Sequence, residues 1–285
     1  RQMREFLARS FRGYPDLGGL PLPQETIRGG APDYKIPYSA NTSVGFTRDF
    51  GTAFSVRADY VHTRTHDPSI GPDTNWVQNP DGTFSRRDRR YGNITLVTNG
   101  GFIKYDGLVT RAELRASDTA RAGISYTLSK TTSNMSTGLS TGGVTNPFDL
   151  DEDLGPDDND RRHNLVVDAS YLVPKIDAQL AGIASYRSEL PYSVSTSFQS
   201  DSDPFSDRPE PRNSRRGDKE TTVDVRVSKI LRLGRFSATA FWEMFNVFNV
   251  DNWLRYQGSL QSSTFGLPLT EAPKRRQQLG IRFDF

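Results

Sequence analysis

The sequence predicts an all-β fold, an antiparallel transmembrane β-barrel segment of about nine long strands. Three observations support this prediction. Polar and apolar residues alternate in segments of about ten residues, which is the pattern of strands with one polar and one apolar face. Short turns and long polar stretches alternate between these segments. The chain ends in a segment whose alternate residues are large and apolar.

The expected strands follow one another from residue 38 to the end of the chain. In 51–63 the even positions from Phe54 to Tyr60 are apolar and the odd positions between them are polar. Residues 91–98 are also extended, but a spanning strand there would break the alternation of turns and loops, so we expect a loop hairpin. A helical pattern is confined to residues 2–11. The same alternation as in 51–63 predicts strands at 38–49, 103–117, 119–130, 163–171, 177–189, 222–228, 235–248 and 278–285.

The connections define the two ends of the predicted barrel. In transmembrane barrels the short turns are periplasmic and the long loops extracellular. The domain organisation is therefore a loop region at 1–37 that leads into a barrel portion at 38–285. We expect short turns at 49–51, 117–118, 174–177 and 233–234, and long loops at 64–102, 133–161, 190–220 and 249–275.

Composition and motifs exclude several classes of protein. The 285 residues carry 36 basic and 34 acidic side chains, and a net charge of +2 gives no long-range field for nucleic acid. The absence of cysteine excludes disulfides, thiolate metal sites and cysteine nucleophiles. The sequence has no nucleotide-binding, zinc-protease or serine-hydrolase motif. His62 and His66 are too far apart on a strand to share a metal ion. We therefore expect no catalytic site and no cofactor.

The last eight residues carry a more specific signal. Gln278 is polar, Gly280 follows two residues later, and the aromatics Phe283 and Phe285 occupy alternate positions up to the chain end. This arrangement matches the β-signal of outer-membrane proteins. Physically, it marks an edge strand whose free backbone groups the barrel assembly machinery can bind by β-augmentation. We therefore expect that machinery as a partner.

An acidic segment lies in the second long loop, at 149–160. Its opening aspartates Asp149, Asp151 and Asp153 resemble the start of a calcium loop. Gly155 stands one place late for an EF-hand, however, and the closing glutamate is missing. A solvated loop is favoured, and the three aspartates are weak calcium candidates.

Basic residues gather in the next long loop, at Arg208, Arg212, Arg215 and Arg216. Arginine forms bidentate pairs with carboxylates and phosphates. Ion pairs with the acidic loop and contact with an anionic ligand or lipopolysaccharide are both compatible with the sequence. We take the four arginines as a candidate ligand-contact loop.

Several short motifs, taken together with the terminal signal, resemble one family. They resemble the barrel of TonB-dependent outer-membrane receptors, and their order resembles the C-terminal part of the Oar-like subgroup, which has a carboxypeptidase-regulatory-like domain. The resemblance covers about 35–285. The motifs are Tyr126-Thr-Leu-Ser-Lys130, Asp160-Arg-Arg-His163, Asp207-Arg-Pro209 with Arg212-Asn213, Val223-Asp-Val-Arg-Val-Ser-Lys229, and Phe245-Asn-Val-Phe-Asn249.

The resemblance implies a 22-stranded barrel with a plug in the bacterial outer membrane. Such a receptor binds a small molecule, a glycan or a peptide through its long loops and lumen face, and imports it with energy from the TonB complex. The implied partners are outer-membrane lipid and lipopolysaccharide, the assembly machinery, and the TonB complex through an N-terminal region. The plug, TonB box and signal peptide are missing from this sequence, so we expect a C-terminal fragment with two unpaired sheet edges.

A protein that is not a transporter is the alternative. It would be either a small complete outer-membrane barrel, acting as an adhesin or a hydrolase, or a soluble glycan-binding β-sandwich. In a barrel the apolar strand faces meet lipid, whereas in a sandwich they pack against a second layer. The two unpaired edges and the surroundings of the apolar face therefore distinguish these alternatives.

Overall fold

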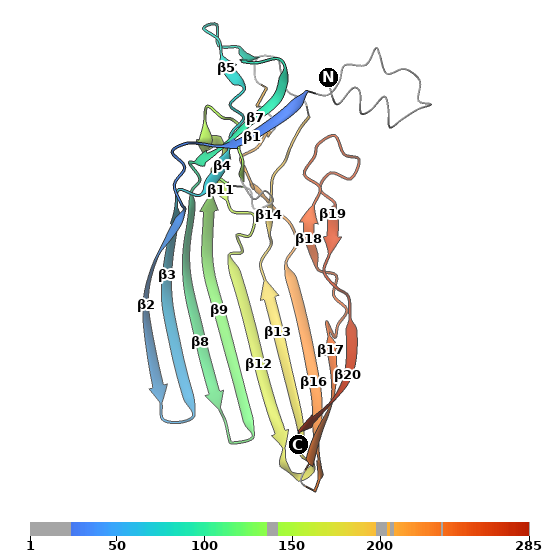
Figure 1. The fold of residues 1–285 in the computed structure, drawn as a ribbon. Helices are drawn as coiled ribbons and strands as arrows, with labels where there is room; N and C mark the ends of the chain where they lie inside the picture. The colour runs from blue at the N-terminus through green and yellow to red at the C-terminus, as the bar shows by residue number, and fades with distance from the viewer. Residues whose placement is uncertain (1–23, 136–141, 198–203, 206–207, 235, 285) are drawn as a thin grey trace, which may run out of the picture.

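The computed structural model describes residues 24–135, 142–197, 204–205, 208–234 and 236–284. One antiparallel sheet of nine long strands dominates it, and each strand pairs with the next long strand along the chain (Figure 1). All nine strands predicted from the alternation are present. They are β2 (Tyr38–Phe50), β3 (Phe54–His66), β8 (Ile103–Arg115), β9 (Ala120–Ser133), β12 (His163–Val173), β13 (Ala178–Arg187), β16 (Glu220–Leu233), β17 (Phe236–Phe245) and β20 (Arg276–Asp284).

The short turns lie at one end of this sheet and the long loops at the other (Figure 1). Three of the four short turns use the left-handed backbone conformation, with a φ of 65° at Gly51, 49° at Asp177 and 66° at Gly234. Glycine and aspartate adopt this conformation more readily than other residues do. The predicted order of turns and loops is therefore confirmed.

The loop end carries a second, four-stranded sheet of β1 (Glu25–Gly30), β7 (Tyr91–Asn99), β4 (Ser69–Gly71) and β10 (Gly142–Gly143). Two predictions need correction here. The extended segment 91–98 lies outside the large sheet as expected, but β7 pairs with β1 in parallel as well as with β4 in antiparallel, so it is more than a hairpin. The region 1–37 is not only loop, because it contains β1. The helical pattern at 2–11 lies outside the described residues.

Smaller elements complete the loop end. The short strand β11 (Gly155–Pro156) extends the large sheet beside β9. Within the described residues, no helix is long and apolar enough to cross a membrane. The remaining elements are the strand pairs β5 (Trp76–Gln78) with β6 (Phe84–Arg86), β14 (Pro191–Tyr192) with β15 (Arg215–Arg216), and β18 (Trp253–Tyr256) with β19 (Pro268–Glu271), and the 3-10 helices η1 (Leu150–Asp153) and η2 (Pro174–Ile176).

The register separates the large sheet into an apolar and a polar face. Val227 pairs with Trp242, and Trp242 pairs with Leu279, so these three share the apolar face. The exposed fraction is 82% for Leu279 and 65% for Phe283. Over the described residues, no second layer covers this face, which excludes the packing of a soluble sandwich.

The polar face carries ion pairs that join neighbouring strands. One row runs from Arg226 through Glu243 to Gln278, with 2.7 Å between Arg226 Nη1 and Glu243 Oε1 and a hydrogen bond from Gln278 to Glu243. The guanidinium of Arg226 also lies 4.3 Å from the ring centroid of Phe241. Phe241 packs over Gly280, where a Cβ atom would collide with the ring. The sequence thus places glycine where an aromatic ring must cross the neighbouring strand.

The two edges of the large sheet remain open. The order begins at β2 and ends at β20, and these two strands do not pair with each other in the described part of the chain. This confirms the prediction of two unpaired edges and contradicts a small closed barrel formed by these nine strands alone.

Candidate functional site

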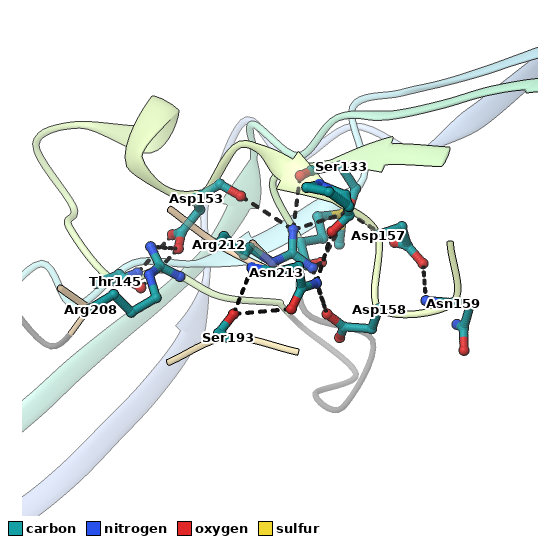
Figure 2. Close-up of polar contacts among 12 residues, drawn as sticks. Ser133, Thr145, Asp153, Asp157, Asp158, Asn159, Ser193, Arg208, Arg212 and Asn213 are labelled. Carbon is teal, nitrogen blue, oxygen red and sulfur yellow. Dashed lines mark hydrogen bonds and ion pairs between the residues drawn. The ribbon is translucent and has the colours of Figure 1, made fainter. Parts of the chain in front are cut away.

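The predicted acidic and basic loops meet at the loop end of the sheet (Figure 2). One connects β9 to β12 and contains the acidic segment, and the other connects β13 to β16 and contains the four arginines. Ion pairs between the two loops, one of the two outcomes compatible with the sequence, are confirmed at Arg208, Arg212 and Arg216.

Arg212 is the centre of this contact. Its Nη2 lies 2.9 Å from Asp158 Oδ1, and its Nη1 donates to the backbone oxygens of Ser133 at 2.8 Å and Asp153 at 3.2 Å. A further hydrogen bond goes to the backbone oxygen of Met135. Only 4% of Arg212 is exposed. A buried guanidinium needs this many acceptors to offset the loss of water.

A second buried pair, between Arg216 and Asp160, fixes the start of β12. Asp160 is fully buried and accepts from Arg216 Nη2 at 2.5 Å and from the amide of Thr131 at 2.6 Å, and it forms an ion pair with Arg162 Nε at 3.2 Å. Arg216 also donates to the backbone oxygen of Asp160 at 2.6 Å. The carboxylate therefore joins β9, β12 and the arginine loop at one point.

Asp153 forms an ion pair with Arg208 and, in the described part of the chain, does not share a metal site with the neighbouring aspartates. Its carboxylate lies 2.7 Å from Arg208 Nη2 and accepts 2.8 Å bonds from the amide and the hydroxyl of Thr145. Asp149 caps the amide of Asp151 at 3.0 Å at the start of η1. Among the described residues, no group of three carboxylates or histidines could hold a metal ion. The three weak calcium candidates are therefore not brought together.

Arg215 differs from the other three arginines because it is exposed. It pairs with Glu210 of its own loop at 2.6 Å, and its guanidinium lies 5.5 Å from the ring centroid of Phe265. The hydrogen bonds from Arg215 and then from Ser214 lower the pKa of Glu210, and the same contact raises the pKa of Arg215. This arginine is the one of the four whose charged group is most available to a ligand.

The backbone also brings the two loops close together. A Cβ atom on Gly155 would lie 2.6 Å from the backbone oxygen of Arg212, so only glycine permits this approach. Asn213, with a φ of 54°, donates from Nδ2 to the backbone oxygen of Pro156 at 2.8 Å and to Asp158 Oδ1 at 2.7 Å. The Arg212-Asn213 motif therefore acts as one unit against the acidic loop.

The sequence alone gave no indication of two aromatic contacts at the loop end. Tyr192 and Tyr256 stack with ring centroids 5.5 Å apart, and Tyr256 donates to Asp218 Oδ2 at 2.6 Å. Burial and this hydrogen bond raise the pKa of Tyr256 to about 12. The second contact is a cluster of four rings from three loops, with centroids 5.0 to 5.9 Å apart, formed by Trp76, Phe84, Phe148 and Phe205.

The histidines have structural partners. His62 Nδ1 lies 2.8 Å from Asp106 Oδ1, His163 Nδ1 lies 2.7 Å from the Tyr126 hydroxyl, and His66 stacks on a tyrosine ring. The loop end thus brings together charged and aromatic side chains from several loops.

The terminal strand places its predicted signal on both faces. Gln278 and Gly280 lie on the polar face, and Phe283 lies on the apolar face, where it pairs with Ala238. Phe285 lies outside the described residues. The packing of Phe241 gives Gly280 a second reason to be glycine, besides any reading by the assembly machinery.

The sequence also matches a known family. The family described as outer membrane beta barrel domain matches residues 8–210. No curated protein matches the chain.

Solved structures share the fold of the large sheet. The outer membrane transporter YddB from Escherichia coli aligns with a TM-score of 0.63 and 15% identity, over 91% of this chain and 34% of YddB. The FrpB iron transporter from Neisseria meningitidis, F3-3 variant, aligns with a TM-score of 0.57 and 15% identity, over 90% of this chain and 32% of FrpB. The chain therefore spans about a third of the length of these transporters.

Proposed function

The chain belongs to the outer membrane beta barrel domain family, and from this premise we propose that it forms part of a TonB-dependent transporter. The whole protein would bind a ligand at its extracellular loops and lumen and import it with energy from the TonB complex. The ligand class is a small molecule, a glycan or a peptide. The proposal assigns no catalytic residue and no cofactor to this chain.

One observation carries the proposal. The nine-stranded sheet is open at β2 and β20, and it aligns with about a third of two transporters. An unpaired strand edge in hydrocarbon costs several kcal/mol for each unsatisfied backbone group. Further strands that pair with both edges would remove this cost, and a 22-stranded wall around a plug would provide them.

The contacts at the loop end support different roles for the four arginines. Arg208, Arg212 and Arg216 hold the two loops together through buried or half-buried ion pairs. Arg215 is paired at the surface beside Phe265, where a planar anionic group could replace Glu210. We therefore assign Arg215 to ligand contact and the other three to the shape of the site.

Several finer points belong to the same proposal. Outer-membrane lipid and lipopolysaccharide surround the barrel, the assembly machinery reads the terminal strand, and the TonB complex engages a segment outside this sequence. The Oar-like subgroup stays a prediction from the motifs. A small complete barrel, as an adhesin or a hydrolase, has no observation in its favour once β2 and β20 are seen to be unpaired.

Nutrient depletion in culture tests the proposed transport. The gene for the full-length protein and the gene for TonB are deleted separately, and the compounds that remain in the medium are compared by mass spectrometry. We expect at least one compound to persist in both deletion strains and to disappear again when the full-length gene is restored. Identical depletion in the wild type and in the deletion strain of the full-length gene, with altered surface adhesion, would contradict the proposal.

A further inference from the structure

Basic side chains lie on the apolar face of the sheet, just beyond its apolar band at the loop end. The register places Tyr60, Leu108 and Leu128 in one row across β3, β8 and β9. The next row toward the loops is His62, Asp106 and Lys130, and the row after it contains Arg64 and Lys104. We call Arg64, Lys104 and Lys130 the cationic rank.

One carboxylate organises the neighbourhood of this rank. Asp106 accepts from the Tyr60 hydroxyl at 2.7 Å, lies 2.8 Å from His62 Nδ1, and pairs with Lys104 Nζ at 3.0 Å. Asp106 is the one acidic residue in these two rows, against three permanent cations.

The other two cations are less constrained. Arg64 lies over the Phe102 ring, with 5.4 Å between its Cζ and the ring centroid. Within the described part of the chain, Arg64 and Lys130 form no ion pair, and both are exposed. The rank therefore has positive charge that its own neighbours do not neutralise.

The position of the rank indicates what it faces. Side chains on this face look outward, toward lipid, and the loop end of a transmembrane barrel is the extracellular end. Tyr60 and Tyr126 lie at the margin of the apolar band, as aromatic residues do at the level of the lipid headgroups. Three adjacent strands are about 10 Å wide at about 4.8 Å per strand. That width suits a lipid headgroup with more than one anionic group.

The turn end of the same face provides a contrast. Its cations, Arg48 on β2 and Lys229 on β16, stand far apart in the sheet order instead of on neighbouring strands. Arg48 lies over the Phe50 ring with 5.1 Å between its Cζ and the ring centroid, as expected for a single interfacial anchor. The clustering of cations is therefore a property of the extracellular end.

We propose that the cationic rank binds the phosphorylated headgroup of lipopolysaccharide in the outer leaflet. Arg64, Lys104 and Lys130 contact the phosphate oxygens, and Asp106 positions the Lys104 ammonium. The charges are complementary, because clustered cations on a lipid-facing surface meet the leaflet whose lipids carry phosphate. The inference rests on the proposed function for the orientation of the barrel and for lipopolysaccharide as a partner.

Lipid binding by the full-length protein tests this site. The protein is purified in detergent and titrated with lipid A, with lipid A from which the phosphates have been removed, and with phosphatidylethanolamine, and binding is followed by native mass spectrometry. The variant R64Q/K104Q/K130Q is compared with the control R48Q/K229Q at the opposite boundary. A gel-mobility shift on heating checks that each variant is folded.

We expect the triple variant to bind lipid A on the order of 100-fold more weakly, at about a fivefold loss for each of the three cations removed. The control variant should bind like the wild type, and lipid without phosphate should bind no better than phosphatidylethanolamine. Unchanged binding by the triple variant would overturn the proposal, as would equal binding of lipid without phosphate. Displacement of lipid A by inorganic phosphate would assign the cations to free anions instead.

The result of the lipid-binding experiment can be told apart from a failure of the proposed transport function. Uptake by cells that express the triple variant depends on the loops, the lumen and TonB, none of which the three substitutions touch. Lost lipid binding with normal uptake supports the site, and normal lipid binding in a protein that transports nothing refutes only the proposed function.

Discussion

The wall of the molecule and its loop end place their charges in opposite ways. In the middle of the wall, large apolar side chains such as Leu279 are exposed on one face, and charged pairs such as Arg226 with Glu243 lie on the other. At the loop end, Asp160 and Arg212 are buried instead. The wall therefore depends on lipid as its apolar partner, whereas the loop end replaces an extensive apolar core with paired charges.

The loop end should be the region that is easiest to break with one substitution. Replacing Arg212 with alanine removes the buried cation that pairs with Asp158, and it removes one donor from each of the backbone oxygens of Ser133 and Asp153. The loss of these charged hydrogen bonds costs on the order of 3 kcal/mol, and not more, because the side chain of Asp158 is 31% exposed and still accepts from Asn213. Hydrogen exchange of residues 142–162 should become much faster, while exchange in β12 and β13 stays unchanged.

Arg215→Ala is the matched control for that prediction. Arg215 is exposed, and the loss of a surface ion pair costs about 0–1 kcal/mol. Equal effects of the two substitutions on loop exchange would show that the buried pair has no special role.

The wall should respond to a charge on the apolar face. Val225→Arg puts a cation among lipid tails and is expected to cost about 2–4 kcal/mol near the middle of the membrane. The free energy of folding into lipid vesicles, measured by urea titration, gives this value. Arg226→Gln, one residue further on the polar face, should change stability by about 1 kcal/mol or less. A larger loss of stability for Arg226→Gln than for Val225→Arg would mean that the lipid and lumen faces are assigned the wrong way round.

The terminal strand should affect assembly and not ligand binding. Phe283 is exposed on the apolar face, away from the loops, so it has no route to a ligand at the loop end. In the full-length protein, Phe283→Ser with Phe285→Ser is expected to lower the amount of protein in the outer membrane. Ligand affinity of the molecules that assemble should stay unchanged. Normal abundance with lost binding would instead place the terminus in a ligand site.

The smallest expected effect is the titration of one tyrosine at the loop end. Burial and the hydrogen bond to Asp218 raise the pKa of Tyr256 to about 12 from its ordinary value of 10.0. Because the folded pKa is raised, the stability from this contact is present below pH 10, falls above it, and is lost by about pH 12. Absorbance titration should show a tyrosine component near pH 12 that Tyr256→Phe removes. A missing component would mean that Tyr256 is solvated.

The difference between the wall and the loop end also explains which features could be predicted from the sequence. The nine strands were predictable because each has one face toward lipid, so alternation such as Phe54, Val56, Ala58 remains visible in the sequence. The sequence could not predict that Arg212 pairs with Asp158 and that Arg216 pairs with Asp160. The two residues of each pair are more than 50 positions apart in the sequence, and the packing of the loops decides which residues meet. The parallel pairing of β1 with β7 could not be predicted for the same reason.

One face of the large sheet is expected to meet lipid, and the other face is expected to meet an aqueous lumen. The sequence contains no cysteine, so single cysteines introduced at positions 224 to 227 can carry a nitroxide label in the full-length protein in lipid vesicles. Electron paramagnetic resonance then measures the access of oxygen, which concentrates in lipid, and of a water-soluble nickel chelate. Labels at Val225 and Val227 should favour oxygen, and labels at Asp224 and Arg226 should favour the chelate. Equal access of the chelate to all four positions would contradict a membrane-spanning wall.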